Sequence, residues 1–240
     1  MNNIKRYNLF ILFSTIARNI VEVFSSVLLY KIGYTFREIL LFYSILYFTG
    51  MITSIGSIYL TKIIKPKYIL MLSSIIFSGS FYFMSVMDRT FINLVIFSII
   101  NGIGAYSYHS LRHYYAIKVI DNHNNKEIGN ILIFSNIATI FSSLIGAYIQ
   151  ELLSVLILAI IIVIISIIAI IPIVKLKDAS DNNTIKLEKI SKNKLLFFLL
   201  EQAKVINLTL QPLYLYLFIN SRVTYVGIFN VVMGISACIF

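Results

Sequence analysis

The sequence has no tryptophan and only one cysteine, Cys238, among its 240 residues. One cysteine excludes an internal disulfide and leaves no thiol pair to bind a metal. Without tryptophan, an aromatic belt at a membrane surface has to consist of tyrosine. Tyrosines do lie near the ends of apolar runs, at Tyr7, Tyr30, Tyr34, Tyr59, Tyr68, Tyr148 and Tyr225.

Charged residues are also scarce. They make up 12% of the chain, whereas hydrophobic residues make up 59%, and the mean hydropathy is +0.88. Such a composition does not fit a single water-soluble core. We therefore predict an all-α, polytopic membrane protein.

Long apolar runs with short polar breaks between them support this prediction. About 20 apolar residues are needed for a helix to cross a bilayer. The runs predict membrane spans at 8–30, 39–60, 68–87, 91–119, 128–150, 152–174, 195–219 and 223–240.

The net charge of +10 is distributed unevenly between the two ends of these spans. Most lysines and arginines flank one side, including Lys5, Arg6, Lys62, Lys65, Lys67, Lys118, Lys126, Lys175, Lys177, Lys186, Lys189, Lys192 and Lys194. The other side has Lys31, Arg37, Arg89 and Arg222. Because cytoplasmic loops are enriched in basic residues, we expect a cell or inner membrane protein with a cytoplasmic N-terminus. A basic face on a soluble module is missing, so nucleic acid is not an expected partner.

Charged and amide side chains interrupt the first, fourth and seventh spans. A charge at the middle of a bilayer costs about 2.5–3.5 kcal/mol on insertion scales and persists where it faces a partner or a wet cavity. The pattern therefore predicts a central cavity lined by these helices. The candidate residues are Arg18, Asn19, Glu22, His109, Arg112, His113, Glu201, Lys204 and Asn207.

Arg18 and Glu22 are four residues apart in the first span. In one continuous helix they would share a face, as a local ion pair or as part of the cavity wall. A local pair does not offset the desolvation of two ions in lipid, which favours the cavity wall.

His109 and His113 have the same spacing, which would let two imidazoles reach one metal ion. A metal site is not expected here, because a third ligand is needed and Arg112 would repel a cation. Arg112 lies near the predicted cytoplasmic end, where it either lines the cavity or extends to lipid phosphates.

Glu201 and Lys204 follow six apolar residues of the seventh span and are expected inside the membrane. Burial makes an acid easier to protonate, so Glu22 and Glu201 are the candidates if transport is coupled to protons. The cations Arg18, Arg112 and Lys204 outnumber these two acids, which slightly favours an anionic or zwitterionic solute.

The order of the spans and the polar segment after the sixth span resemble the Major Facilitator Superfamily. The loop after the second span, from Gly56 to Lys67, keeps a glycine and the basic end of that family's motif but not its acid or second glycine. In the fifth span, Ser142 to Gly146 stands where antiporter members have a Gly-Pro motif. The resemblance implies two six-helix halves joined by a cytoplasmic loop, with a cavity lined by helices 1, 4 and 7.

On this resemblance, residues 1–174 form a six-helix half, residues 175–194 form the linker, and residues 195–240 form helices 7 and 8. Because the family has about twelve spans, we expect the chain to be truncated in its second half. We predict a secondary transporter of a small solute with no cofactor. The alternatives are an intramembrane enzyme acting on lipid-linked substrates, for which the short loops offer few groups, and a non-transporting scaffold or receptor.

Overall fold

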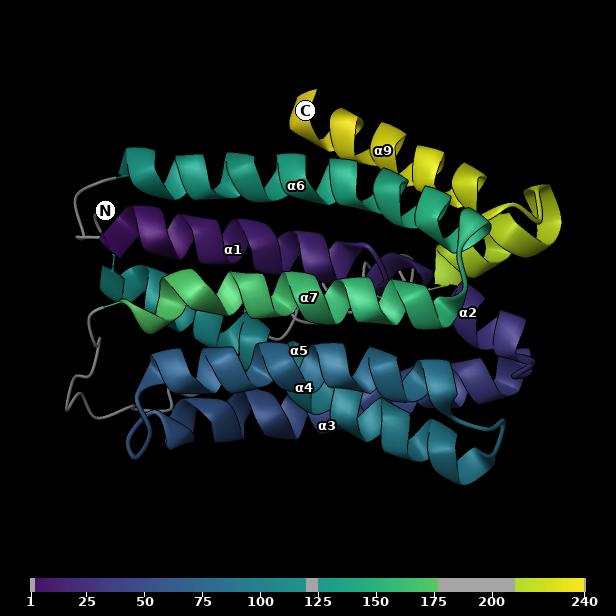
Figure 1. Cartoon of the computed structure of the whole chain (residues 1–240), viewed down its shortest axis with the longest axis horizontal. Helices are drawn as coiled ribbons and strands as arrows, with labels where there is room; N and C mark the ends of the chain where they lie inside the picture. Colours follow the sequence, from purple (N-terminus) through teal and green to yellow (C-terminus); the bar gives the residue numbers. More distant parts are fainter. Residues whose placement is uncertain (1–2, 120–124, 177–209, 240) are drawn as a thin grey trace, which may run out of the picture.

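The computed structural model describes residues 3–119, 125–176 and 210–239. In these ranges the chain consists of helices and turns, and the long helices run beside one another along the long axis of the molecule (Figure 1). The predicted all-α, polytopic fold is confirmed. The elements are α1 Asn3–Asn19, η1 Glu22–Phe24, α2 Ser25–Ile32, α3 Phe36–Leu60, α4 Pro66–Val86, α5 Phe91–Val119, α6 Asn125–Leu152, α7 Val155–Val174, the π-helical turn η2 Leu215–Ile219, and α9 Val223–Ile239.

Within the described residues, five helical segments are long and apolar enough to cross a membrane. They are Asn3–Ile32, Phe36–Leu60, Pro66–Val86, Phe91–Tyr115 and Val155–Val174. Each coincides with a predicted span to within a few residues. The first span begins earlier than expected, at Asn3, and comprises α1, η1 and α2 rather than one regular helix.

Local sequence signals set several helix ends. Thr35 and Glu38 form a capping box at the start of α3, in which the Thr35 hydroxyl accepts from the Glu38 N–H and the Glu38 carboxylate accepts from the Thr35 N–H at 2.6 Å. Pro66 occupies the first turn of α4, where its missing N–H costs nothing. Gly33 ends α2 with a φ of +105°, a left-handed conformation that glycine adopts without strain.

The helices pack as a layered bundle in which α5 lies against both α3 and α4. Helix α7 packs against α1 and α4, and α6 packs against α1 and α9. Since lipid provides no hydrophobic drive between helices, close approach of small residues has to hold them together. At Gly104 of α5, an added Cβ atom would lie 2.6 Å from the backbone nitrogen of Phe77 in α4.

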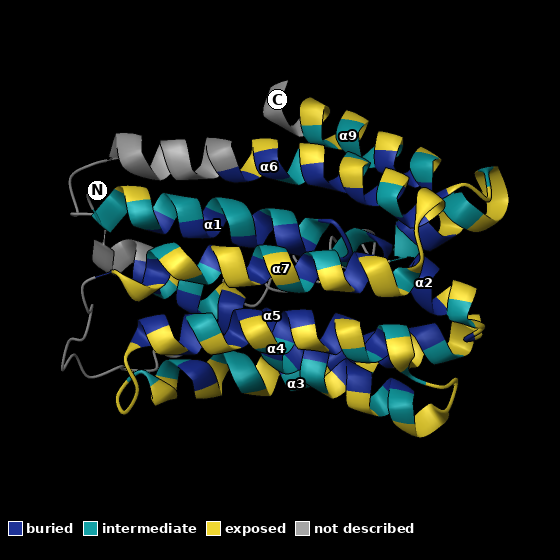
Figure 2. Cartoon of the chain, viewed as in Figure 1, coloured by how far each residue is buried: buried dark blue, intermediate teal, exposed yellow. Residues whose placement is uncertain are grey.

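Exposed apolar side chains follow the outer faces of the helices (Figure 2). On α7, Ile160, Ile164, Ile167 and Ile171 are exposed, while Leu158, Ile162 and Ile173 are buried against neighbouring helices. The predicted sixth span therefore exposes an aliphatic face on the outside of the bundle.

Candidate functional site

The first span is broken near the middle of its length. Helix α1 ends at Asn19, and a turn at Ile20 and Val21 precedes the 3-10 turn η1. The N–H of Val21 donates to the carbonyl of Arg18 at 3.0 Å, three residues back, so the regular α-helical ladder is interrupted. In a membrane, the backbone groups that such a break releases need other partners.

Side chains of α1 and α6 form hydrogen bonds at the break, and the one from Gln150 reaches a backbone carbonyl within it. Gln150 of α6 donates its Nε2–H to the carbonyl oxygen of Ile20 at 3.1 Å. Asn19 donates its Nδ2–H to the Thr15 carbonyl at 2.9 Å and to the Thr139 hydroxyl of α6 at 3.2 Å. Gly146 lets α6 come close to the break, because an added Cβ atom there would lie 2.4 Å from the Ile20 oxygen.

A cavity of about 700 Å³ opens beside this break. A volume of this size suits a small-molecule ligand. Its walls come from the broken first span, α3, α5, α6 and α9. The lining residues are Asn19, Glu22, Val23, Ser25, Phe42, Tyr43, Leu46, Tyr47, Asn101, Ala105, Tyr106, His109, Thr139, Ile140, Ser143, Asn230, Met233 and Gly234.

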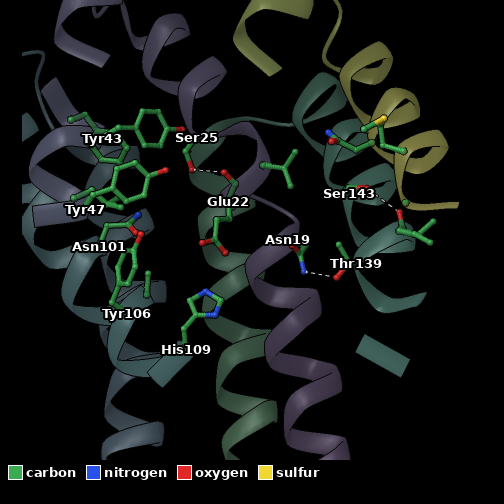
Figure 3. Close-up of a pocket in the computed structure, with 18 residues that line it drawn as sticks. Asn19, Glu22, Ser25, Tyr43, Tyr47, Asn101, Tyr106, His109, Thr139 and Ser143 are labelled. Carbon is green, nitrogen blue, oxygen red and sulfur yellow. Dashed lines mark hydrogen bonds between the residues drawn. The ribbon is translucent and has the colours of Figure 1, made fainter. Parts of the chain in front are cut away.

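Glu22 extends from the break into the cavity (Figure 3). In this view the Glu22 side chain points toward the His109 ring, with Tyr47 and Tyr106 on one side and Asn19 on the other. Among the described residues, the Glu22 carboxylate has no hydrogen-bond or ion-pair partner. The described wall therefore presents a carboxylate beside an imidazole, aromatic rings and amides.

Arg18 does not line this cavity. Its side chain is 4% exposed, and its guanidinium carbon lies 4.0 Å from the ring centroids of both Phe77 in α4 and Tyr108 in α5. Its Nη2 donates to the Gly104 carbonyl at 3.0 Å. The predicted common face of Arg18 and Glu22 is wrong, because the break redirects the chain between them.

The other sequence candidates fall into three groups. Asn19, Glu22 and His109 line the cavity. Arg112 and His113 lie further along α5 and are not part of the lining. Glu201, Lys204 and Asn207 lie outside the described residues. In the described part of the chain, no group of three or more His, Cys, Asp or Glu side chains is placed to hold a metal ion.

Several polar lining residues were not among the sequence candidates. Tyr43 and Tyr47 of α3, Thr139 and Ser143 of α6, and Asn230 of α9 all line the cavity, as does Asn101 of α5. Asn101 and Asn230 interrupt apolar runs, a signal that would have found them. The hydroxyls of Thr139 and Ser143 donate to backbone carbonyls of their own helix, as is common for these residues, so they gave no such signal. Tyr43 and Tyr47 are largely apolar side chains and did not interrupt the hydrophobic run.

The fold and the cavity define a multi-pass membrane protein with a polar chamber at a broken helix. The family model described as Major Facilitator Superfamily matches residues 7–240. The chain belongs to the Major Facilitator Superfamily.

Among solved structures, the chain resembles the one described as "Crystal structure of nucleoside transporter NupG", with a TM-score of 0.66 and 13% sequence identity. The match covers 86% of this chain and 53% of that one, so the chain spans about half the length of the solved transporter. At this identity the likeness shows the fold alone. The search of curated proteins found no match.

Proposed function

We propose that the protein is a secondary transporter that carries a small polar solute through the central cavity by alternating access. The observation that carries this proposal is the position of the cavity, which lies beside the break in the first span. Transporters of several folds bind solutes near the membrane midplane at interrupted helices. Family membership and the fold shared with a solved transporter support transport over the enzymatic and scaffold alternatives.

The solute preference differs from the one predicted from sequence. That prediction counted Arg18, Arg112 and Lys204 as cavity cations. Arg18 and Arg112 are not part of the lining, and Lys204 lies outside the described residues. Amides, hydroxyls and aromatic rings dominate the polar part of the described wall. We therefore propose a solute with hydrogen-bonding groups and no net negative charge. Nucleosides, the solutes in the name of the solved transporter, are one class that such a wall would accept.

Glu22 and His109 are the proposed proton carriers if transport is proton-coupled. Both line the cavity, so both would be reached by water and by solute in turn. Because Glu22 and His109 lie close together, a solute and a proton could compete for the Glu22 carboxylate. Alternatively, a proton on one of the two side chains could favour binding of the solute to the other. Glu201, the other acid predicted for this role, lies outside the described residues.

Uptake into proteoliposomes tests the transport proposal. Replacing Thr139 with tryptophan places a large ring in the cavity and should reduce uptake of any transported solute at least tenfold, with the protein still folded. Ile137→Trp is the matched control, since Ile137 lies two positions away in α6 and is 45% exposed on the outer surface. A panel of radiolabelled neutral, cationic and anionic solutes would be measured with each protein. If no member of the panel entered wild-type vesicles faster than empty vesicles, the transport proposal would be wrong.

The proposed orientation places the N-terminus and the loop between α3 and α4 in the cytoplasm. The basic residues at this end of the bundle, including Lys62 and Lys65, support it. In a Cys238→Ser background, Arg89→Cys should react with an impermeant maleimide in intact cells, whereas Lys62→Cys should react only after permeabilisation. The reverse pattern would require the opposite orientation.

A further inference from the structure

Within the described part of the chain, the cavity lining contains a carboxylate and no lysine or arginine. Glu22 is the only acidic side chain of the lining formed by the described residues. An ionised carboxylate at membrane depth is costly unless a cation or water accompanies it. A positively charged group of the solute would lower that cost when it binds.

Aromatic rings form the wall beside this carboxylate. The ring centroids of Tyr43 and Tyr47 lie 6.0 Å apart, and those of Tyr47 and Tyr106 lie 6.2 Å apart with their planes at 84°. All three tyrosines line the cavity and lie on the same side of Glu22 in Figure 3. The negative faces of such rings attract ammonium groups, most strongly where water is excluded.

Arg18, the buried arginine of α1, has contacts away from the cavity. The Arg18 guanidinium is in contact with the rings of Phe77 and Tyr108 and donates to Gly104, and it forms no ion pair with Glu22 in the described structure. The positive charge of Arg18 weakens the negative potential around Glu22, but the guanidinium does not lie on the cavity side of the carboxylate. No described residue pairs with the carboxylate on that side, where it lines the cavity.

We propose that the cavity recognises a solute with a protonated amine or quaternary ammonium group, held by the Glu22 carboxylate and the wall of Tyr43, Tyr47 and Tyr106, an assignment that rests on the transport function proposed above. The amide of Asn19, which lies on the other side of Glu22 from the tyrosines in Figure 3, would bind a polar group at the other end of the solute. Apolar residues of the lining, such as Phe42 and Met233, would contact its carbon skeleton.

Binding of matched charged and uncharged probes tests this proposal. Tyramine and tyrosol differ by an ammonium in place of a hydroxyl, and choline and 3,3-dimethylbutan-1-ol differ by a charged nitrogen in place of carbon. Isothermal titration of the purified protein at pH 8, where an ordinary histidine is neutral, measures each affinity. We expect at least one amine to bind at least tenfold more tightly than its uncharged partner.

Glu22→Gln removes the charge and keeps the shape, and should abolish that difference between the partners of a pair. Asp88→Asn is the matched control, because it removes one acidic charge from the exposed turn between α4 and α5 and should leave the difference unchanged. Equal binding of charged and uncharged partners by the wild type, failure of both amines to bind, or an undiminished difference in Glu22→Gln would overturn the proposal.

The uptake panel separates this proposal from the transport function itself. Selective uptake of amines that Glu22→Gln eliminates would support both. Uptake of neutral or anionic solutes without amines would overturn the amine assignment and retain transport. Binding of amines without uptake of any solute would retain the site and overturn transport.

Discussion

Replacing Arg18 with alanine should lower the free energy of unfolding by about 3–5 kcal/mol. This estimate combines the cost of a large-to-small substitution in a core with the loss of a desolvated cation–π contact. The loss has a geometric source, because the guanidinium fills the space between the rings of Phe77 and Tyr108. Alanine would leave that space empty and the Gly104 carbonyl without its donor. Since these contacts join α1 to α4 and α5, the whole first half of the described bundle should weaken. Thermal unfolding in detergent measures the effect.

Two further variants separate packing from charge at this position. Arg18→Met keeps most of the side-chain volume without the charge and should cost about 2 kcal/mol or less, because a buried charge also carries a desolvation cost that methionine avoids. Arg37→Ala removes an exposed arginine from the start of α3 and should change stability by about 0.5 kcal/mol or less. If Arg18→Ala unfolded at the wild-type temperature but lost uptake, Arg18 would have to be assigned to the solute, as the sequence predicted.

The membrane spans could be predicted from sequence because length and hydropathy alone determine them. A stretch such as Val155–Val174 contains no charged residue and is too long and too apolar for any other environment. The polar residues inside the first and fourth spans likewise indicated a chamber, and Asn19, Glu22 and His109 do line one. These signals are local, so no knowledge of the packing was needed to read them.

The break at Ile20 and Val21 could not be predicted in the same way. Neither residue is proline or glycine, and their sequence is compatible with a continuous helix. The break is stabilised by Gln150 and Gly146, which lie more than a hundred residues away in the chain. Arg18 lies in α1 before the break, and its packing between Phe77 and Tyr108 depends on how α1, α4 and α5 fit together, which the sequence does not specify.

The sequence also does not specify which helices line the cavity, because that too depends on packing between distant segments. Glycines of α3 and α6 make close contacts between helices: Gly50 lies against the Tyr106 ring, and Gly146 lies against Ile20. Yet α3 and α6 also contribute cavity residues such as Tyr47 and Thr139. A single helix can serve both purposes because its two faces meet different neighbours, and sequence spacing does not say which neighbour each face meets.

Replacing Gly146 with alanine should be nearly as damaging as the loss of Arg18, although it adds only one methyl group. The added Cβ atom would lie 2.4 Å from the Ile20 oxygen, 2.8 Å from its Cα and 2.9 Å from its carbonyl carbon, and none of these backbone atoms can rotate away. To relieve the clash, α6 would have to move outward, which would stretch the bonds from Gln150 to Ile20 and from Asn19 to Thr139. Overpacking of this kind costs about 1–3 kcal/mol, and here the bonds that satisfy the broken helix would be lost as well.

Gly79→Ala is the matched control for this substitution. Gly79 lies within α4, and an added Cβ atom there would meet nothing within 4 Å. Alanine is the better helix former by about 1 kcal/mol, so this variant should unfold at or above the wild-type temperature. Gly146→Ala should unfold well below it and should transport poorly, because the break that it disturbs forms one wall of the cavity. If the two variants proved equally stable, the close approach of α6 to the broken helix would not be a feature of the folded protein, and the shape of the cavity beside it would have to be different.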